Sequence, residues 1–102
     1  MTDQAWKTAE RRIATLLGGE RVPVTGRQRG NAPDVAHSWL SIEVKHRKSL
    51  PAWLFDAMAQ ARASAGGQQL PIAVLHQAGD LYTRSLVVME LSDFMTWVKG
   101  IQ

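Results

Sequence analysis

The sequence predicts an α/β domain in which a central mixed sheet is flanked by helices. Apolar residues recur at helical spacing near the N-terminus, where Trp6, Ile13 and Leu17 share one face of residues 3–17. Residues 40–45, Leu-Ser-Ile-Glu-Val-Lys, alternate between apolar and polar, which is typical of a strand with one covered face. Along the whole chain the expected elements follow the order α-β-β-β-α-β-β-α, which mixes helices and strands throughout.

The first half of the chain begins with a helix and a short strand. The helix over residues 3–17 should end at the two glycines that follow it, because glycine favours helix C-termini. Residues 20–25 form a short strand that contains a proline, so we expect an edge strand or a bulge there. Residues 26–31, Gly-Arg-Gln-Arg-Gly-Asn, form a loop.

A hairpin is predicted next. Its first arm is residues 34–36, its turn is residues 37–39, and its second arm is residues 40–45. Because side chains alternate along a strand, the second arm should present two faces. One face carries Ser41, Glu43 and Lys45, and the other carries Leu40, Ile42 and Val44.

The second half of the chain should contain two helices and two strands. A helix is expected over residues 51–65, and a strand buried on both faces over residues 70–76, where the sequence is nearly all apolar. A turn at 77–80 leads to a strand at 86–90. A last helix over 92–99 should begin with Ser92 as its N-cap.

Length and composition limit the function classes. The 102 residues suit one domain, residues 1–102, and 45% of them are hydrophobic, as in an ordinary globular protein. No apolar run approaches the roughly 20 residues that cross a bilayer, so no membrane partner is expected. The absence of cysteine excludes disulfides and thiolate zinc sites, and it suits the cytoplasm. No phosphate-binding loop or dinucleotide fingerprint indicates a nucleotide cofactor.

The charge is distributed unevenly. Residues 1–50 hold nine Lys/Arg and five Asp/Glu, whereas residues 51–102 hold three and four. A basic half beside a nearly neutral half either forms a face for a polyanion or is a solvated surface that keeps the chain soluble.

Three charged residues of the predicted hairpin indicate a catalytic site. Antiparallel pairing can bring Asp34 on one arm towards Glu43 on the other, with Lys45 on the same face as Glu43. Mg²⁺ is usually held by one or two carboxylates together with water and phosphate, and a lysine can stabilise charge on a phosphate. This combination predicts a Mg²⁺-dependent nuclease. Taken singly, each feature has a simpler interpretation as a surface charge pair or a turn residue.

A third carboxylate lies in the first predicted helix. Glu10 falls within the apolar stripe of that helix, and a buried carboxylate needs a partner or a metal. It contributes to the metal site, or lies at the edge of the stripe and extends its carboxylate to solvent, or pairs with an arginine.

These residues resemble a known nuclease superfamily. Pro33-Asp34 followed by Glu43-Val44-Lys45, after a helix with a glutamate, resembles the PD-(D/E)xK superfamily, whose restriction-endonuclease-like core has the order αβββαβ. Within that superfamily the chain looks most similar to archaeal-type and phage-type Holliday junction resolvases. The resemblance covers about residues 6–76. The chain is shorter than typical resolvases, and its loop at 26–31 lacks the serine that theirs often carries.

The resemblance implies a role for each matching residue. Asp34 and Glu43 would bind Mg²⁺, with Mn²⁺ as a substitute, the Val44 carbonyl would join them, and Lys45 would be the catalytic lysine. Glu10 would match the glutamate of the family's first helix. Gln60 would match the glutamine of its second helix, although from the residues alone it could equally face solvent. A phage or prophage source is also implied.

Further basic residues adjoin the hairpin and are candidates for contacts with DNA phosphates. They are Arg27, Arg29, Lys7, Arg11, Arg47 and Lys48. Any single one is otherwise a solvated charge. Trp39 stands in the predicted turn, where it could serve as a dimer contact or as a wedge against DNA.

The function predicted from the sequence is a metal-dependent endonuclease for branched DNA, acting as a homodimer so that two sites cut two strands. Three alternatives stay open: a nuclease for flaps, nicks or single strands or of the restriction type, a DNA-binding module without turnover, and a protein-interaction domain.

Overall fold

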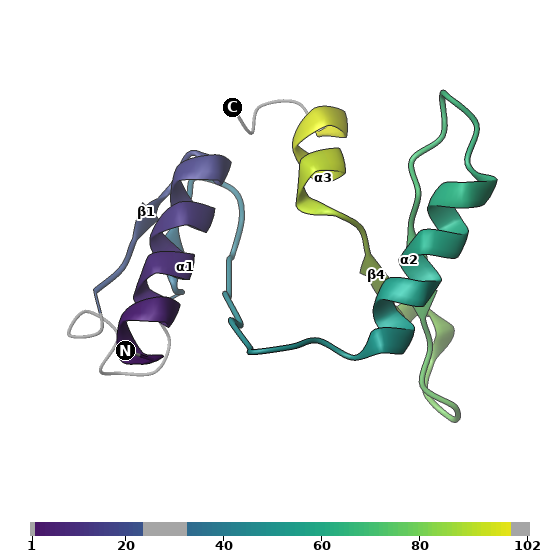
Figure 1. Cartoon of the computed structure of the whole chain (residues 1–102), viewed down its shortest axis with the longest axis horizontal. Helices are drawn as coiled ribbons and strands as arrows, with labels where there is room; N and C mark the ends of the chain where they lie inside the picture. Colours follow the sequence, from purple (N-terminus) through teal and green to yellow (C-terminus); the bar gives the residue numbers. More distant parts are fainter. Residues whose placement is uncertain (1, 24–32, 99–102) are drawn as a thin grey trace. The chain divides into compact units, whose positions relative to one another are not determined.

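The computed structural model describes residues 2–23 and 33–98 of the chain (Figure 1). They form two compact units, the first within Met1–Lys48 and the second within Ser49–Lys99, and each is described by itself. The loop predicted at 26–31, with Arg27 and Arg29, lies outside the described residues, as does the end of the strand predicted at 20–25. The single domain stays a prediction.

The first unit opens with helix α1, Thr2–Leu17, which confirms the helix predicted at 3–17. The helix ends as its glycines predict. Gly18 has a φ of 75°, a left-handed conformation that costs glycine little. The N–H groups of Gly18 and Gly19 donate to the carbonyls of Thr15 and Ala14, which satisfies two carbonyls of the last turn.

Two short strands follow α1. Strand β1, Glu20–Arg21, pairs antiparallel with β2, Val35–Ala36, so that Arg21 faces Val35. On its other side Val35 forms an antiparallel bridge with Ile42. Strand β2 therefore lies between β1 and the segment that contains Ile42.

The predicted second arm of the hairpin, residues 40–45, keeps its two faces but pairs at one point only. Its apolar residues are half-buried and its polar residues are exposed, as the alternation predicts. Of the described residues in this arm, only Ile42 bridges to β2. Pro33, just before Asp34, has no N–H, so the first arm cannot extend the ladder in that direction.

The core of the first unit lies between α1 and its strands. Ala14, Leu17 and Val35 are buried, and Val35 is completely enclosed. Helix α1 packs against both β1 and β2 (Figure 1). A Cβ atom on Gly19 would lie 2.4 Å from the Ala36 carbonyl oxygen and 2.8 Å from Cγ1 of Val35. The helix end therefore approaches β2 closely because residue 19 has no side chain.

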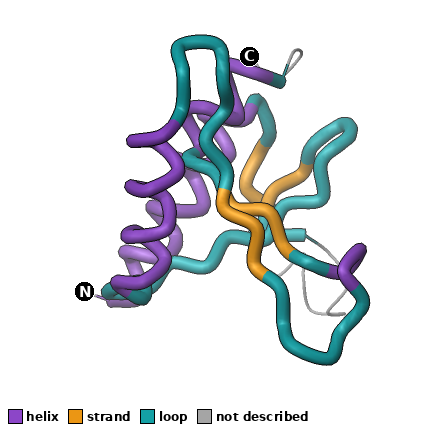
Figure 2. The backbone as a smooth tube through the Cα atoms, turned by 90° about the vertical axis from the view of Figure 1, so that its right-hand side faces the viewer, coloured by secondary structure: helices purple, strands orange, loops and turns teal. Residues whose placement is uncertain are grey.

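The second unit contains two α-helices and a strand pair joined by turns (Figure 2). In chain order its elements are α2 (Ala52–Ser64), β3 (Ala73–Leu75), the 3-10 helix η2 (Tyr82–Arg84), β4 (Leu86–Val88) and α3 (Leu91–Trp97). The helices and strands predicted at 51–65, 70–76, 86–90 and 92–99 are present in shortened form. Strands β3 and β4 are antiparallel, with Val74 facing Val87.

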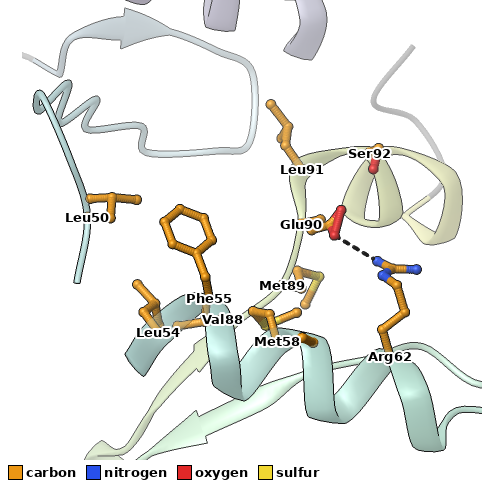
Figure 3. Close-up of a pocket in the computed structure, with 11 residues that line it drawn as sticks. Leu50, Leu54, Phe55, Met58, Arg62, Val88, Met89, Glu90, Leu91 and Ser92 are labelled. Carbon is orange, nitrogen blue, oxygen red and sulfur yellow. Dashed lines mark hydrogen bonds and ion pairs between the residues drawn. The ribbon is translucent and has the colours of Figure 1, made fainter. Parts of the chain in front are cut away.

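Two predictions for the second unit are wrong. Strand β3 is not buried on both faces, because Val74 and its cross-strand neighbour Val87 are both exposed while α2 packs against β3. Ser92 is not the N-cap of the last helix. Glu90 holds that position, and its side chain makes no cap bond. The Glu90 carboxylate instead pairs with Arg62 on α2 at 3.1 Å (Figure 3).

Arg62 joins α2 to the start of α3. Its guanidinium pairs with both Glu90 and Asp93. The hydrogen bond and charge of Asp93, followed by the charge of Glu90, raise the pKa of Arg62 above its ordinary value. Arg62 and Glu90 are exposed and Asp93 is half-buried, so solvent screens the pairing and limits its contribution to stability.

The protein is thus a small α/β chain with three α-helices and two two-stranded antiparallel sheets in its described part. None of the described helices combines the length and the apolar character needed to traverse a bilayer.

The packing at Gly19 predicts a local stability effect. Gly19→Ala should lower the free energy of unfolding by about 1–3 kcal/mol, because a backbone carbonyl stands where the methyl group must go. Gly67→Ala is the matched control, since a Cβ there meets no atom within 4 Å. Urea unfolding monitored by circular dichroism measures both. Equal stability of the two variants would contradict the close approach.

Candidate active site

Asp34 is held in a fixed orientation beside the second arm of the hairpin. The residue is only 6% exposed. Its backbone N–H donates to the Ile42 carbonyl at 3.1 Å, and its Oδ2 accepts the Val44 N–H at 2.6 Å. Asp34 is therefore bonded to the residues on either side of Glu43.

A β-bulge explains how the Asp34 side chain is aimed. Asp34 bonds to Ile42, and Val35 bridges to the same residue, so two residues of one arm oppose one residue of the other. A bulge bends its strand and redirects a side chain. Here the redirected carboxylate takes a main-chain N–H that a regular ladder would give to a carbonyl.

Glu43 and Lys45 lie on the exposed face of the same arm. Their side chains are 60% and 69% exposed, and Lys45 Nζ lies 3.9 Å from Oε2 of Glu43. An ion pair this exposed and this long contributes little to stability. Both groups are accessible to a ligand from solvent.

Val44 follows Glu43 in the chain and bonds to the carboxylate of Asp34. Its N–H is used by Asp34, and its side chain is half-buried. In extended backbone the N–H and C=O of one residue point towards the same edge of the strand. If the backbone at Val44 is extended, its carbonyl points to the same edge as the N–H that bonds to Asp34.

Glu10 is buried on α1, as its position in the apolar stripe predicts. Its Oε1 accepts a hydrogen bond from Nε of Arg21 on β1 at 2.9 Å. The Arg21 guanidinium also lies over the Trp6 ring, 5.5 Å from its centre. The arginine partner that the sequence left open is thus Arg21, and a role of Glu10 in binding metal stays a prediction.

The donor set suits a hard cation. Carboxylate and carbonyl oxygens are the ligands of Mg²⁺ and Mn²⁺, and Mg²⁺ needs only one or two carboxylates when water and phosphate complete its shell. Asp34, Glu43 and the Val44 carbonyl provide such oxygens. Within residues 2–23 and 33–98, no three Asp, Glu or His side chains gather into a metal site. Binding of Mg²⁺ by Asp34, Glu43 and the Val44 carbonyl stays a prediction.

The other predicted site residues are distributed over both units. Gln60 lies on α2 in the second unit and is exposed. The four described basic candidates all belong to the first unit, and three are exposed while one is half-buried. They are Arg11, Arg47 and Lys48, and the half-buried Lys7, whose Nζ lies 5.6 Å from the Trp6 ring centre.

His37 is a structural residue whose full role the sequence did not reveal. Its Nδ1 accepts the N–H groups of Trp39 at 3.3 Å and Leu40 at 3.2 Å, so its Nε2 carries the proton and donates to the Leu17 carbonyl at 2.8 Å. One imidazole therefore closes the hairpin turn and caps α1. A turn position was the only signal in the sequence, and it does not identify the helix carbonyl.

The second unit contains an apolar hollow of about 710 Å³ between α2 and the segment that leads into α3 (Figure 3). Leu54, Phe55, Met58 and Met89 provide much of its lining. Its charged lining residues, Arg62 and Glu90, pair with each other. The hollow thus presents apolar surface rather than a set of acid and base groups.

The two acid–base pairs of the first unit predict contrasting stability effects. Glu10→Gln should cost about 2–4 kcal/mol, because Arg21 would lose its buried counter-charge. Glu43→Gln breaks an exposed pair and should cost less than about 1 kcal/mol. Urea denaturation of both variants tests the contrast. A smaller loss for Glu10→Gln than for Glu43→Gln would refute the assignment of the buried pair.

The chemical character of the site follows from one buried and two exposed groups. Asp34 offers a carboxylate of fixed orientation, Glu43 a carboxylate open to solvent, and Lys45 an ammonium that can meet a phosphate oxygen.

No protein-family model, curated protein or solved structure matches this chain.

Proposed function

We propose that this chain is a metal-dependent endodeoxyribonuclease that hydrolyses phosphodiester bonds in branched DNA. In this proposal the fold is a restriction-endonuclease-like core, and two copies act as a homodimer. The observation that carries the proposal is the bonding of Asp34 to Ile42 and Val44, which flank Glu43.

Asp34 is suited to bind a cation because its side chain is already oriented, so binding costs little further conformational entropy. The Val44 N–H fixes one carboxylate oxygen, and the bulge fixes the backbone. Preorganised charge of this kind is the main source of electrostatic catalysis. A buried carboxylate is also expensive without a bonded partner, which explains why the hydrogen bond accompanies the burial.

Glu43 and Lys45 have the complementary property of access. Their weak pair at 3.9 Å can be exchanged for contacts with a substrate at small cost. Lys45 would place positive charge on the scissile phosphate or orient the attacking water. Because both side chains extend from the same face of one strand, a phosphate can meet them together.

Asp34 and Glu43, with the Val44 carbonyl, would hold Mg²⁺ or Mn²⁺. When bound, the ion would lower the pKa of a coordinated water and neutralise charge on the phosphate. The protein supplies the fixed oxygens and the ammonium beside them. Glu10 and Gln60 are proposed as supporting residues of the same site, as the resemblance implies.

DNA as the substrate is supported by charge. The first unit's residues 1–48 include nine Lys/Arg against five Asp/Glu. Arg11, Arg47 and Lys48 are exposed in that unit, so their charges act on solvent and ligands rather than on the core. Phosphate contacts of this kind give affinity that depends on salt and tolerates sequence variation, which suits an enzyme that selects DNA by structure.

Cleavage assays test the catalytic assignment. Asp34→Asn, Glu43→Gln and Lys45→Ala should each lower the cutting rate of labelled four-way-junction DNA with Mg²⁺ about a hundredfold or more, while DNA binding persists. Arg84→Ala is the matched control for Lys45, since both cations are 69% exposed in ion pairs. Asp56→Asn controls for loss of an acid.

Flap, single-stranded and fully paired DNA, each with Mg²⁺ or with EDTA, complete that assay. Faster cutting of the junction supports the branched-DNA assignment. Faster cutting of another DNA form would make that form the substrate instead. If the wild-type protein binds DNA but cuts none of these substrates with Mg²⁺ or Mn²⁺, the chain is a DNA-binding module and the nuclease proposal fails.

The basic residues predict a separate effect on binding. Lys48→Ala and Arg47→Ala should each weaken binding about equally for all DNA sequences, and each should reduce the slope of log affinity against log salt by about one. Fluorescence anisotropy in EDTA at several salt concentrations measures this. An unchanged slope in both variants would show that these two cations do not contact phosphates.

A further inference from the structure

Trp39 is an exposed tryptophan at the end of the hairpin that carries the candidate site. It lies in the turn between β2 and the second arm, and it is 53% exposed. Tryptophan has a large apolar ring that solvent does not favour. An exposed ring at a turn therefore has a surface available for a flat, apolar partner.

The turn that presents Trp39 is bonded to the end of α1 through His37. The Trp39 N–H donates to Nδ1 of His37, and the other His37 nitrogen is bonded to the Leu17 carbonyl at the end of α1. The His37 and Trp39 rings meet edge to face, with 5.8 Å between their centres and 74° between their planes. Both the backbone N–H and the indole of Trp39 thus contact an imidazole that is bonded to the end of α1. Contacts made before a ligand binds reduce the conformational entropy lost on binding.

The net positive charge of the first unit, with nine Lys/Arg against five Asp/Glu in residues 1–48, favours nucleic acid over an apolar protein as the partner of Trp39. The hairpin continues into Lys45, Arg47 and Lys48, which are all exposed. Trp53 offers a comparison, because it is 58% exposed but belongs to the second unit, which has no excess of positive charge. Proteins that bind single-stranded DNA combine aromatic rings, which stack on bases, with cations, which contact phosphates, and the first unit provides both kinds of group.

The hairpin sets how far this contact lies from the candidate site. Four residues separate Trp39 from Glu43, and a fully extended chain of that length spans no more than about 14 Å. Nucleotides along one strand of a duplex are spaced by about 3.4 Å. A base stacked on Trp39 would therefore lie within about four nucleotides of a phosphate at Glu43.

We propose that Trp39, which contacts His37, stacks on an unpaired base of the DNA substrate within about four nucleotides of the bond that is cut. This contact would distinguish DNA with unpaired bases from a fully paired duplex, whose bases are already stacked. The inference rests on the proposed DNA-cleaving function, and it is tested by binding without divalent metal so that cleavage plays no part.

The experiment compares two labelled DNAs in EDTA: a fully paired duplex and the same duplex ending in a splayed fork. Trp39→Ala should weaken binding to the fork about tenfold and binding to the duplex less than about twofold. Trp39→Phe, which keeps a smaller ring and preserves the fold, should fall between. Trp53→Ala is the control and should bind both DNAs as the wild type does.

Tryptophan emission gives a second readout. Stacking on a base should quench the emission of the wild-type protein with the fork, and Trp39→Phe should lose most of that quenching. The proposal is overturned if both Trp39 variants bind the fork as tightly as the wild type, or if the loss is equal on fork and duplex. Light scattering gives the molecular mass of the wild type and of the Trp39 variants. If the variants differ from the wild type in mass but not in DNA affinity, the proposal is also overturned, and Trp39 is a contact between protein chains.

The two proposals fail separately. If the wild type cuts DNA with Mg²⁺ but Trp39 has no effect on fork binding, only the stacking inference is lost. If the wild type binds the fork through Trp39 but never cuts, only the nuclease assignment is lost.

Discussion

The enclosure of Val35 beneath helix α1 is the constraint on which the first unit depends. Val35 is completely buried and pairs with Arg21 on one side and Ile42 on the other. Its burial requires the end of α1 to approach β2 so closely that a side chain on Gly19 has no room. Since Asp34 directly precedes Val35 in the chain, its position is set by the same packing. The candidate site is therefore adjacent to the place where Gly19 closely approaches β2.

The bulge at Asp34 converts that packing into a usable site. A regular antiparallel ladder would direct main-chain groups at one another and leave the carboxylate to solvent. With two residues opposing Ile42, the ladder ends, and the Val44 N–H goes to the Asp34 carboxylate instead. Bulges recur beside active sites because they re-aim side chains at the point where pairing stops. The fixed orientation of Asp34 is thus a consequence of this local feature, and Pro33 also prevents the pairing from extending past Asp34.

The periodic patterns in the sequence correctly predicted which side chains are buried and which are exposed. The period of two in residues 40–45 correctly gave the exposed face with Glu43 and Lys45, and the helical stripe correctly gave a buried Glu10. Features that depend on contacts between distant residues could not be predicted in this way. The bond from His37 to the Leu17 carbonyl joins residues 20 positions apart. The exposure of Val74 depends on which elements cover β3, and the pairing of Glu90 with Arg62 displaced the expected cap.

Charge and burial together separate the groups that hold the first unit together from those that can meet a ligand. Glu10 and Arg21 cancel each other where solvent is largely excluded, so this pair adds stability but little external field. Glu43, Lys45, Arg47 and Lys48 are exposed, and their net charge is positive. The field of the hairpin therefore attracts an anion, while the carboxylates of Asp34 and Glu43 would repel one. Under the proposed function, a divalent cation between these carboxylates and a phosphate would remove that repulsion.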